Sequence, residues 1–425
     1  MKALVIERDL PRFGAARLAG SLRPGSGAKV GPLKLDELDD LDLPGDEWVR
    51  ITPRLSGICG SDLATVDGRS SRWFEPIVSF PFIPGHEVVA DHDGRRVVLE
   101  PVLGCVTRGI SPVCPACAQG RLGNCERLAH GCIDAGLQSG YCCDTGGGWS
   151  TEMVAHRSQL HDVPDELDDR AAVMIEPTAC AVHAALSANI SADETVAVIG
   201  AGTLGLLTLA AIDRWSPARR IIVAAKHPHQ KELAQEFTAK SEYVGTSPSS
   251  LPRAVRSAVG TQIVEGEHTE SSGWGHDSRL GGGADVTIDC VGSAESIQMA
   301  LAITRPGGRI VMVGMPGLQT IDLTPLWQRE ISLTGAYTYG IETVNGSKIR
   351  TFDLATELVV AADLGRLVSA TYALERFSDA LQHAATAGRL GAVKIAFSNV
   401  DPDHRAAPTM SPKKSTMSPR KAGRR

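Results

Sequence analysis

The stretch Thr195-Val-Ala-Val-Ile-Gly200-Ala-Gly202-Thr-Leu-Gly205 decides the fold of this chain. We expect an apolar strand over Thr195–Ile199, then a glycine turn, then a helix from Leu204. Gly200 permits the tight turn, Gly202 lets the backbone approach a phosphate, and Gly205 lets helix and strand pack closely. The helix N-terminus adds free N–H groups and a positive dipole end. The stretch therefore predicts a dinucleotide-binding loop formed by Gly200, Gly202, Thr203, Leu204 and Gly205.

Strands and helices continue to alternate after this loop. Strands are predicted over Ile221–Ala225, Val286–Asp289 and Arg309–Val313, and helices over His229–Ala239 and Ala294–Ile303. The pair Gly307-Gly308 is expected to form a turn, and Gly260–Gly283 a long polar loop. This alternation predicts an α/β fold with a doubly wound parallel sheet.

The end of the second strand bears on the choice of cofactor. An NAD enzyme normally has Asp or Glu there for the ribose hydroxyls, whereas this chain has Ala225 followed by Lys226. Lys226, with His227 and Lys231 nearby, suits a 2′-phosphate, so the sequence favours NADP over NAD. The alternative is a solvated Lys226 with another residue at the ribose. The ends of later strands are expected to place these residues at the nicotinamide side of the cofactor: Val291, Val313, Gly314 and Met315.

Three short segments outside this unit carry the ligand types of a catalytic zinc: Cys59-Gly-Ser61-Asp62, Gly85-His86-Glu87 and Glu176-Pro177. Cys59 offers a thiolate and His86 a neutral imidazole, and the last protein ligand is Glu87 or Glu176. Asp62 suits a supporting role, accepting the other ring N–H of His86.

Each segment alone has a simpler explanation. A lone cysteine is usually a buried core residue, and Glu-Pro often begins a helix. The three segments in this order, followed by the glycine loop, instead indicate an open zinc beside a dinucleotide. That combination predicts alcohol oxidation by hydride transfer. Polar residues within Arg69–Glu75 favour a sugar or polyol as the substrate, and the alternatives are threonine, a small aldehyde and an amino-cyclitol.

The order of motifs is similar to that of the zinc-dependent medium-chain dehydrogenase/reductase family over roughly residues 1–398. Its most specific parts are Gly57-Ile-Cys-Gly-Ser-Asp62 and Pro84-Gly-His-Glu-Val88. Glu176-Pro177 resembles the polyol, sugar and threonine dehydrogenase branch, because other alcohol dehydrogenases carry a cysteine there. The resemblance implies a GroES-like, β-rich catalytic domain and a Rossmann domain, in a homo-oligomer that is a dimer or a tetramer.

The resemblance also implies roles for residues. Cys59 and His86 would bind zinc, Glu87 and Glu176 would be exchangeable carboxylates around it, and Ser61 would receive the substrate proton. Polyol dehydrogenases often have a relay histidine three residues after the serine, whereas this chain has Ala64. Water or another side chain must then complete the relay.

Seven of the ten cysteines fall within residues 105–143, which favours a metal site over a disulfide framework. Cys114, Cys117 and Cys125 have a C-x2-C-x7-C spacing that suits a closed, structural zinc. Many family members have a fourth cysteine where this chain has Ser111, so Cys105 is predicted to fold back as the fourth ligand. The simpler alternative is a set of reduced, unligated thiols.

The composition of the chain limits its possible partners and its location. The net charge is −6, and residues 401–425 hold seven Lys or Arg against two Asp or Glu, so residues 1–400 are strongly acidic. An acidic body argues against nucleic acid as its main partner and leaves a small alcohol or carbonyl compound as the expected one. The N-terminal apolar run is too short for a signal peptide, so a cytoplasmic location is expected. The uncharged stretch 195–212 is interrupted by glycines, which disfavours a membrane span.

The expected organisation is a catalytic domain over residues 1–165, with a zinc loop at about 104–127, and a dinucleotide-binding domain over 166–335. Residues 336–398 return to the first domain, with helices at about Ile349–Asp363 and Phe377–Ala387 and a strand over Val393–Phe397. Residues 399–425 form a disordered basic tail. Two other functional classes compete with this prediction: a zinc-free quinone or enone reductase on the same fold, and a non-enzymatic binding protein.

Overall fold

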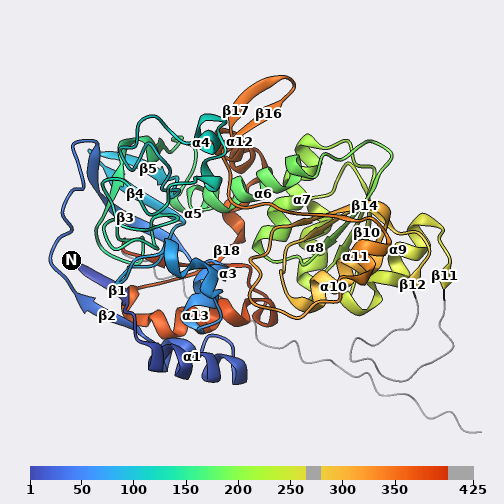
Figure 1. Cartoon of the computed structure of the whole chain (residues 1–425), viewed down its shortest axis with the longest axis horizontal. Coiled ribbons are helices and arrows are strands. Elements are labelled where there is room, and N and C mark those ends of the chain that lie inside the picture. Colours follow the sequence, from blue (N-terminus) through green and yellow to red (C-terminus); the bar gives the residue numbers. More distant parts are fainter. Residues whose placement is uncertain (265–278, 401–425) are drawn as a thin grey trace, which may run out of the picture.

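The computed structural model describes residues 1–264 and 279–400 and contains two main sheets, which form separate lobes in Figure 1. The first is a six-stranded, all-parallel sheet in the order β10-β9-β8-β13-β14-β15. Its strands are β8 (Thr195–Ile199), β9 (Arg220–Ala224), β10 (Glu242–Thr246), β13 (Ala284–Asp289), β14 (Thr304–Met312) and β15 (Ser332–Gly335). The strand order reverses beside β8, as in doubly wound dinucleotide-binding folds, so the predicted parallel sheet is confirmed.

Helices cover both faces of this sheet because its central strands are apolar on both faces. Val196 and Val198 pack in one cluster with α6 and α7, whereas Ala197 and Ile199 pack in another with α9 and α10. The helices that follow these strands are α7 (Thr203–Trp215), α8 (Pro228–Glu236), α9 (Leu251–Val259), α10 (Ala294–Ile303) and α11 (Thr324–Gln328).

The second sheet has seven strands, mostly antiparallel. They are β3 (Trp48–Gly57), β4 (Val88–His92), β5 (Arg95–Leu99), β6 (Met153–His156), β7 (Leu160–Asp162), β18 (Val368–Tyr372) and β19 (Lys394–Ser398). The C-terminal strand β19 pairs with β3, which places residues from the two ends of the chain side by side.

Shorter elements complete the fold. The remaining helices are α1 (Leu10–Leu22), α2 (Gly27–Val30), α3 (Gly60–Val66), α4 (Pro115–Ala118), α5 (Asp169–Ala172), α6 (Ile175–Ser187), α12 (Thr351–Ala362) and α13 (Phe377–Thr386). Three antiparallel pairs are β1 (Lys2–Ile6) with β2 (Leu33–Glu37), β11 (Ile263–Val264) with β12 (Arg279–Leu280), and β16 (Ile341–Val344) with β17 (Ser347–Arg350).

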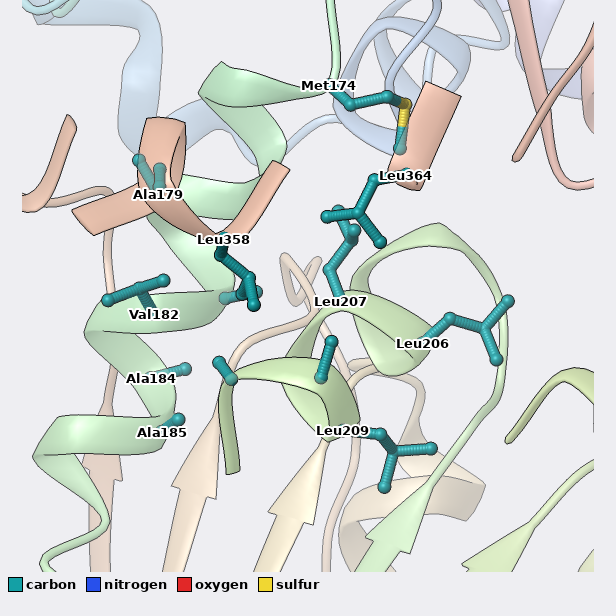
Figure 2. Close-up of a cluster of buried hydrophobic side chains, with 14 of the residues drawn as sticks. Met174, Ala179, Val182, Ala184, Ala185, Leu206, Leu207, Leu209, Leu358 and Leu364 are labelled. Atoms are coloured by element: carbon teal, nitrogen blue, oxygen red, sulfur yellow. The ribbon is translucent and has the colours of Figure 1, made fainter. Parts of the chain in front are cut away.

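The core joins the two lobes through α6. Figure 2 shows α6, which carries Val182, Ala184 and Ala185, beside α7, which carries Leu206, Leu207 and Leu209, with Leu358 of α12 near both helices. α6 also contacts β5 of the second sheet and β14 of the parallel sheet. This helix begins at Ile175 and therefore carries Glu176 into the region between the sheets.

The structure differs locally from the sequence-based predictions. Gly307 and Gly308 lie within β14 instead of forming a turn, and the pairing register with β13 shifts nearby. The helices α1 and α2 were not predicted. The ends of the loop expected over Gly260–Gly283 pair as β11 and β12, while 265–278 and the tail 401–425 lie outside the described residues. Among the described residues, no helix combines the length and apolar character that a membrane crossing needs.

Candidate active site

A cavity of about 1000 Å³ lies between the two sheets. Cys59, His86 and Glu176 line it from one side, and Gly202, Thr203 and Leu204 line it from the other. The two sets of residues that the sequence assigned to metal and cofactor therefore face one shared space.

Local backbone geometry positions Cys59, His86 and Glu87. Cys59 immediately precedes α3, and its backbone N–H donates to Oδ2 of Asp62 at 2.9 Å, which fixes the start of the helix. Gly85 has φ +97°, and a Cβ at this position would meet Trp149. Only glycine suits that turn, which leads His86 and Glu87 into β4.

The structure brings Cys59, His86 and Glu87 together, with one potential ligand atom of each lying within 4.8 Å of the others. A thiolate, an imidazole and a carboxylate are the donor types of a catalytic zinc with three protein ligands. His86 and Glu87 are buried and Cys59 is half-buried. The residues present therefore fit a zinc ion.

Lys394 is a buried cation that sequence reasoning missed. Its Nζ forms an ion pair with Oε2 of Glu87 and donates to the Ile58 carbonyl at 3.3 Å. Burial lowers the pKa of Lys394, but the neighbouring Glu87 and Cys59 outweigh burial and raise it overall. A charged lysine thus holds the Glu87 carboxylate beside the ligand set. A lysine in a predicted strand carries no sequence signal for this contact, because its partner is at the other end of the chain.

Asp62 lies where the sequence predicted a partner for His86. Its Oδ1 is 3.4 Å from Nδ1 of His86 and accepts a hydrogen bond from the Tyr141 hydroxyl at 3.3 Å. Burial raises the pKa of the Tyr141 phenol, and the Asp62 carboxylate adds to that rise. Tyr141 therefore stays protonated and donates to Asp62.

Glu176 is buried nearby but is not part of the close ligand set. Its Oε1 accepts a hydrogen bond from the Tyr339 hydroxyl at 3.0 Å and lies 3.8 Å from Sγ of Cys180. Burial raises the pKa of Glu176 to about 7, and the Glu87 carboxylate also raises it. Of the two glutamates, Glu87 is the one within reach of Cys59 and His86.

Ser61 and Ala64 both line the cavity, as a proton path from the site requires. The hydroxyl of Thr65, one residue after Ala64, lies 2.8 Å from that of Ser70. Two hydroxyl groups thus lie close together in the segment that follows Ala64.

The second set of residues lines the cavity where the sequence predicts the cofactor. A Cβ on Gly205 would lie 2.0 Å from the Gly200 carbonyl oxygen, so this close crossing of loop and helix needs glycine. Gly202 instead has no protein atom within 4 Å of where a Cβ would be, and it faces the cavity. That open space at the start of α7 fits a phosphate group. The predicted nicotinamide-side residues also line the cavity: Val291, Val313, Gly314 and Met315.

Ala225 and Lys226 follow β9 and are not among the residues that line the cavity. Lys226 is exposed. His227 stacks on His229 with ring centroids 5.8 Å apart. Burial lowers the pKa of His227, and the charges of His229, Lys226 and Arg389 lower it further. The end of β9 is thus surrounded by basic side chains.

The four cysteines of the predicted structural site also converge. Sγ atoms of Cys105, Cys114, Cys117 and Cys125 all lie within 4.8 Å of one another. Cys105 Sγ is 3.7 Å from Cys125 Sγ and accepts the Cys114 backbone N–H at 3.3 Å. Four thiols in one buried cluster fit a closed tetrahedral zinc. None of them lines the cavity.

Comparisons with known proteins agree with this arrangement. A family model described as an alcohol dehydrogenase GroES-like domain matches residues 45–165, and one described as a zinc-binding dehydrogenase matches residues 203–353. The chain is 28% identical to a sorbitol dehydrogenase of Arabidopsis thaliana, over 69% of this chain and 75% of that protein. It is 27% identical to a sorbitol dehydrogenase of Bacillus subtilis, over 83% of this chain and 90% of that protein.

Solved structures share the fold. A putative zinc-binding dehydrogenase from Sinorhizobium meliloti, bound to NADP, matches with a TM-score of 0.62 and 23% identity, covering 88% of this chain and 97% of that one. The GroES-like and Rossmann components expected from the sequence are thereby confirmed. The chain belongs to the zinc-dependent medium-chain dehydrogenase/reductase family, in its polyol dehydrogenase branch, and is an NAD(P)-dependent alcohol dehydrogenase.

Proposed function

We propose that this enzyme oxidises an alcohol reversibly at a zinc ion held by Cys59, His86 and Glu87. The observation that carries the proposal is the convergence of these three donors on the cavity that the glycine loop also lines. A bound zinc would supply Lewis-acid stabilisation of the substrate oxygen, and the nicotinamide cofactor would carry the hydride. Relatives named for sorbitol support a hydroxylated small molecule as the substrate.

The chain's own residues then divide the work. Lys394 holds Glu87 in place, and Asp62 orients His86. The Ser61 hydroxyl accepts the proton from the substrate and passes it toward solvent. The N-terminus of α7 would hold the cofactor phosphates, and Val291, Val313, Gly314 and Met315, which line the same cavity, would hold the nicotinamide end.

Replacing the thiolate tests the metal assignment. Cys59→Ser should lower kcat at least ~1000-fold, because the reaction loses its main electrophile. Metal analysis should show one zinc fewer per chain, with an unchanged circular dichroism spectrum. Cys132→Ser is the matched control, because Cys132 is exposed and outside both ligand groups. Turnover retained in Cys59→Ser would contradict the proposal.

We also propose a preference for NADP over NAD. The support is the basic surrounding of the β9 end, where Lys226, His229 and Arg389 lie around His227 and Ala225 replaces the usual acid. Lys226→Ala should reduce kcat/KM for NADP about tenfold while leaving that for NAD nearly unchanged, since one phosphate contact is worth roughly 1.4 kcal/mol here. A wild-type preference for NAD would refute the assignment.

A homo-oligomer and a cytoplasmic location complete the proposal. β15 is an edge strand of the parallel sheet and all four of its residues are exposed, so it offers a surface for a second copy. All ten cysteines, which lie within the described residues, are free of disulfides, which suits a reducing compartment. Light scattering would give the number of subunits.

A further inference from the structure

One wall of the cavity is built by a segment that the sequence motifs did not reveal. Along the chain, helix α1 follows β1 and precedes β2, with which β1 pairs. Leu10, Phe13 and Arg17 of this helix line the same cavity as Cys59 and His86. Arg8, just before the helix, lines it too. The helix therefore faces the space in which the substrate must lie.

The wall is anchored to the segment after α3. Asp67 is fully buried and its two carboxylate oxygens accept the backbone N–H groups of Gly25 and Gly27 at 2.9 and 3.0 Å. These glycines follow α1, so Asp67 ties the helix to the adjacent Arg69–Glu75 segment. Both parts thus form one continuous surface with a fixed geometry.

This surface is strongly basic. Arg8, Arg17, Arg69 and Arg72 line the cavity with Glu75 as the acidic residue among them. The other charged lining groups are Glu87, Glu176 and Lys394, which are buried beside the metal site, together with His86. Four exposed arginines in a chain of net charge −6 mark a local excess of positive charge.

Ion pairing leaves part of this charge available. Glu75 pairs with Arg8 and lies 3.6 Å from Arg72, whose side chain is 92% exposed. Arg69 lies 3.5 Å from Asp67, a carboxylate already engaged by two backbone N–H groups. Among the described residues Arg17 has no acidic partner. Glu75 and Asp67 carry two negative charges against four arginines, so a net positive charge remains.

A run of aromatic rings connects the basic surface to the metal site. Phe13 of α1 meets Phe80 edge-on with centroids 6.3 Å apart, and Phe80 meets Phe82 at 5.1 Å. Phe82 contacts Tyr141 at 5.3 Å, and Tyr141 contacts His86 at 6.0 Å. Apolar walls strengthen the attraction of an anion to the arginines, because less water screens the charges.

From this arrangement we propose that the substrate is an alcohol bearing an anionic group, a carboxylate or a phosphate, remote from the hydroxyl that is oxidised. Arg17, Arg69 and Arg72 bind that group, and the aromatic run covers the body of the molecule. Guanidinium groups suit carboxylate and phosphate because they donate two parallel hydrogen bonds. The inference rests on the proposed function, since it names the substrate class of the same cavity.

The test compares matched alcohols that differ in charge. We would measure kcat/KM for 4-(hydroxymethyl)benzoate against its neutral amide, and for sorbitol 6-phosphate against sorbitol, with the zinc-loaded enzyme and either cofactor. The anion should be preferred about tenfold or more within each pair that is oxidised, and the preference should fall with added salt. Comparing the carboxylate with the phosphate separates the two anion types.

The variants assign the preference to residues. Arg17→Gln combined with Arg69→Gln should bring the ratio within each pair close to one, mainly through KM. Arg12→Gln is the matched control, since Arg12 lies on the same helix but does not line the cavity, and it should keep the wild-type ratio. An equal kcat/KM within each oxidised pair, or a preference that survives in the double variant, would overturn the proposal.

These measurements also distinguish a wrong substrate class from a wrong assignment of the enzyme activity. If neither pair is oxidised with either cofactor, the alcohol dehydrogenase assignment of the cavity fails. Calorimetric binding of 4-(hydroxymethyl)benzoate and its amide then still decides the anion proposal: tighter binding of the acid that is lost in the double variant supports it, and equal binding rejects it.

Discussion

Arg108 shows how one buried charge organises a loop without a regular element. Its side chain is 1% exposed and donates to five backbone carbonyls, those of Leu103, His130, Ile133, Asp134 and Gly136. The segment that carries the cysteine cluster is thereby tied together at both ends. Nothing in the sequence distinguishes Arg108 from a solvated arginine.

Replacing this arginine should therefore be costly. Arg108→Met leaves several buried carbonyls without donors and should lower the free energy of unfolding by about 3 kcal/mol or more. Denaturant titration measures the change, and zinc content reports whether the cysteine site survives. Arg121→Met is the control, because Arg121 is exposed and its guanidinium donates to a side chain, Gln119 Oε1 at 3.2 Å, and not to a buried carbonyl. Equal midpoints for the two variants would show that the carbonyl contacts contribute little.

Single residues also show which features of the site could be predicted from the sequence and which could not. The convergence of Cys59 and His86 with a glutamate, Glu87 or Glu176, was predicted because potential metal ligands are recognisable residue types in a recognisable order. Lys394, Tyr141 and Tyr339 were not predicted, because they act through long-range contacts that leave no local pattern in the sequence. Their roles depend on tertiary pairing, such as that of β19 with β3.

Elements with strong periodicity were predicted well and those stabilised by specific contacts were not. α10 has the predicted bounds, Ala294–Ile303, and α7 begins one residue before the prediction. α1 was missed because Gly14 and Gly20 weaken its helical pattern. Gly20 is nonetheless required, since a Cβ there would lie 2.7 Å from the Asp67 side chain. The close contact with Asp67 requires glycine at position 20, and the same glycine weakens the helical pattern in the sequence.

An ion pair joins the end of α6 to the parallel sheet and should make stability depend on pH. Arg309 of β14 donates to both carboxylate oxygens of Glu194 at 2.7 and 2.6 Å, and to the carbonyls of Ala188 and Asn189 after α6. The hydrogen bonds from Arg309 lower the pKa of Glu194 below its ordinary value, against a smaller effect of burial. This contribution is present above the ordinary glutamate pKa and is lost as pH falls through the lowered one.

Glu194→Gln should consequently destabilise the protein by about 1 kcal/mol at pH 7, because the pair is partly exposed. The difference from wild type should shrink as the pH falls below about 4, where Glu194 itself becomes protonated. Urea titrations of both proteins at several pH values measure it. A difference that stays constant from pH 7 to pH 3 would contradict the charge-based explanation.

At the scale of the whole molecule, the sequence predicted two domains of different kinds, one rich in β-strands and one with the alternating strands and helices of the parallel sheet. It could not predict the pairing of β19 with β3, nor which residues of each sheet face the shared cavity, because these follow from long-range contacts. The division into domains at residues 165 and 335 stays a prediction. The sequence also suggested a polar cleft from Arg69–Glu75, whereas the cavity has an aromatic run beside those residues.

The two proposed zinc sites should act on different properties of the molecule. The thiol cluster shares no residue with the cavity lining, so losing its metal removes a cross-link of the loop without changing the reacting groups. Cys105→Ser, which removes the ligand at the unusual position, should bind one zinc per chain instead of two. We expect the melting temperature to fall by roughly 5–10 °C, a loss of about 3 kcal/mol for a metal site. KM values measured below the transition should stay within about twofold of wild type, because binding groups that remain folded keep their geometry.

Cys132→Ser again serves as the control, with two zinc ions and an unchanged melting temperature. If Cys105→Ser kept both metal ions and full stability, Cys105 would not be the fourth ligand and the cluster would bind its metal, if any, through three thiolates.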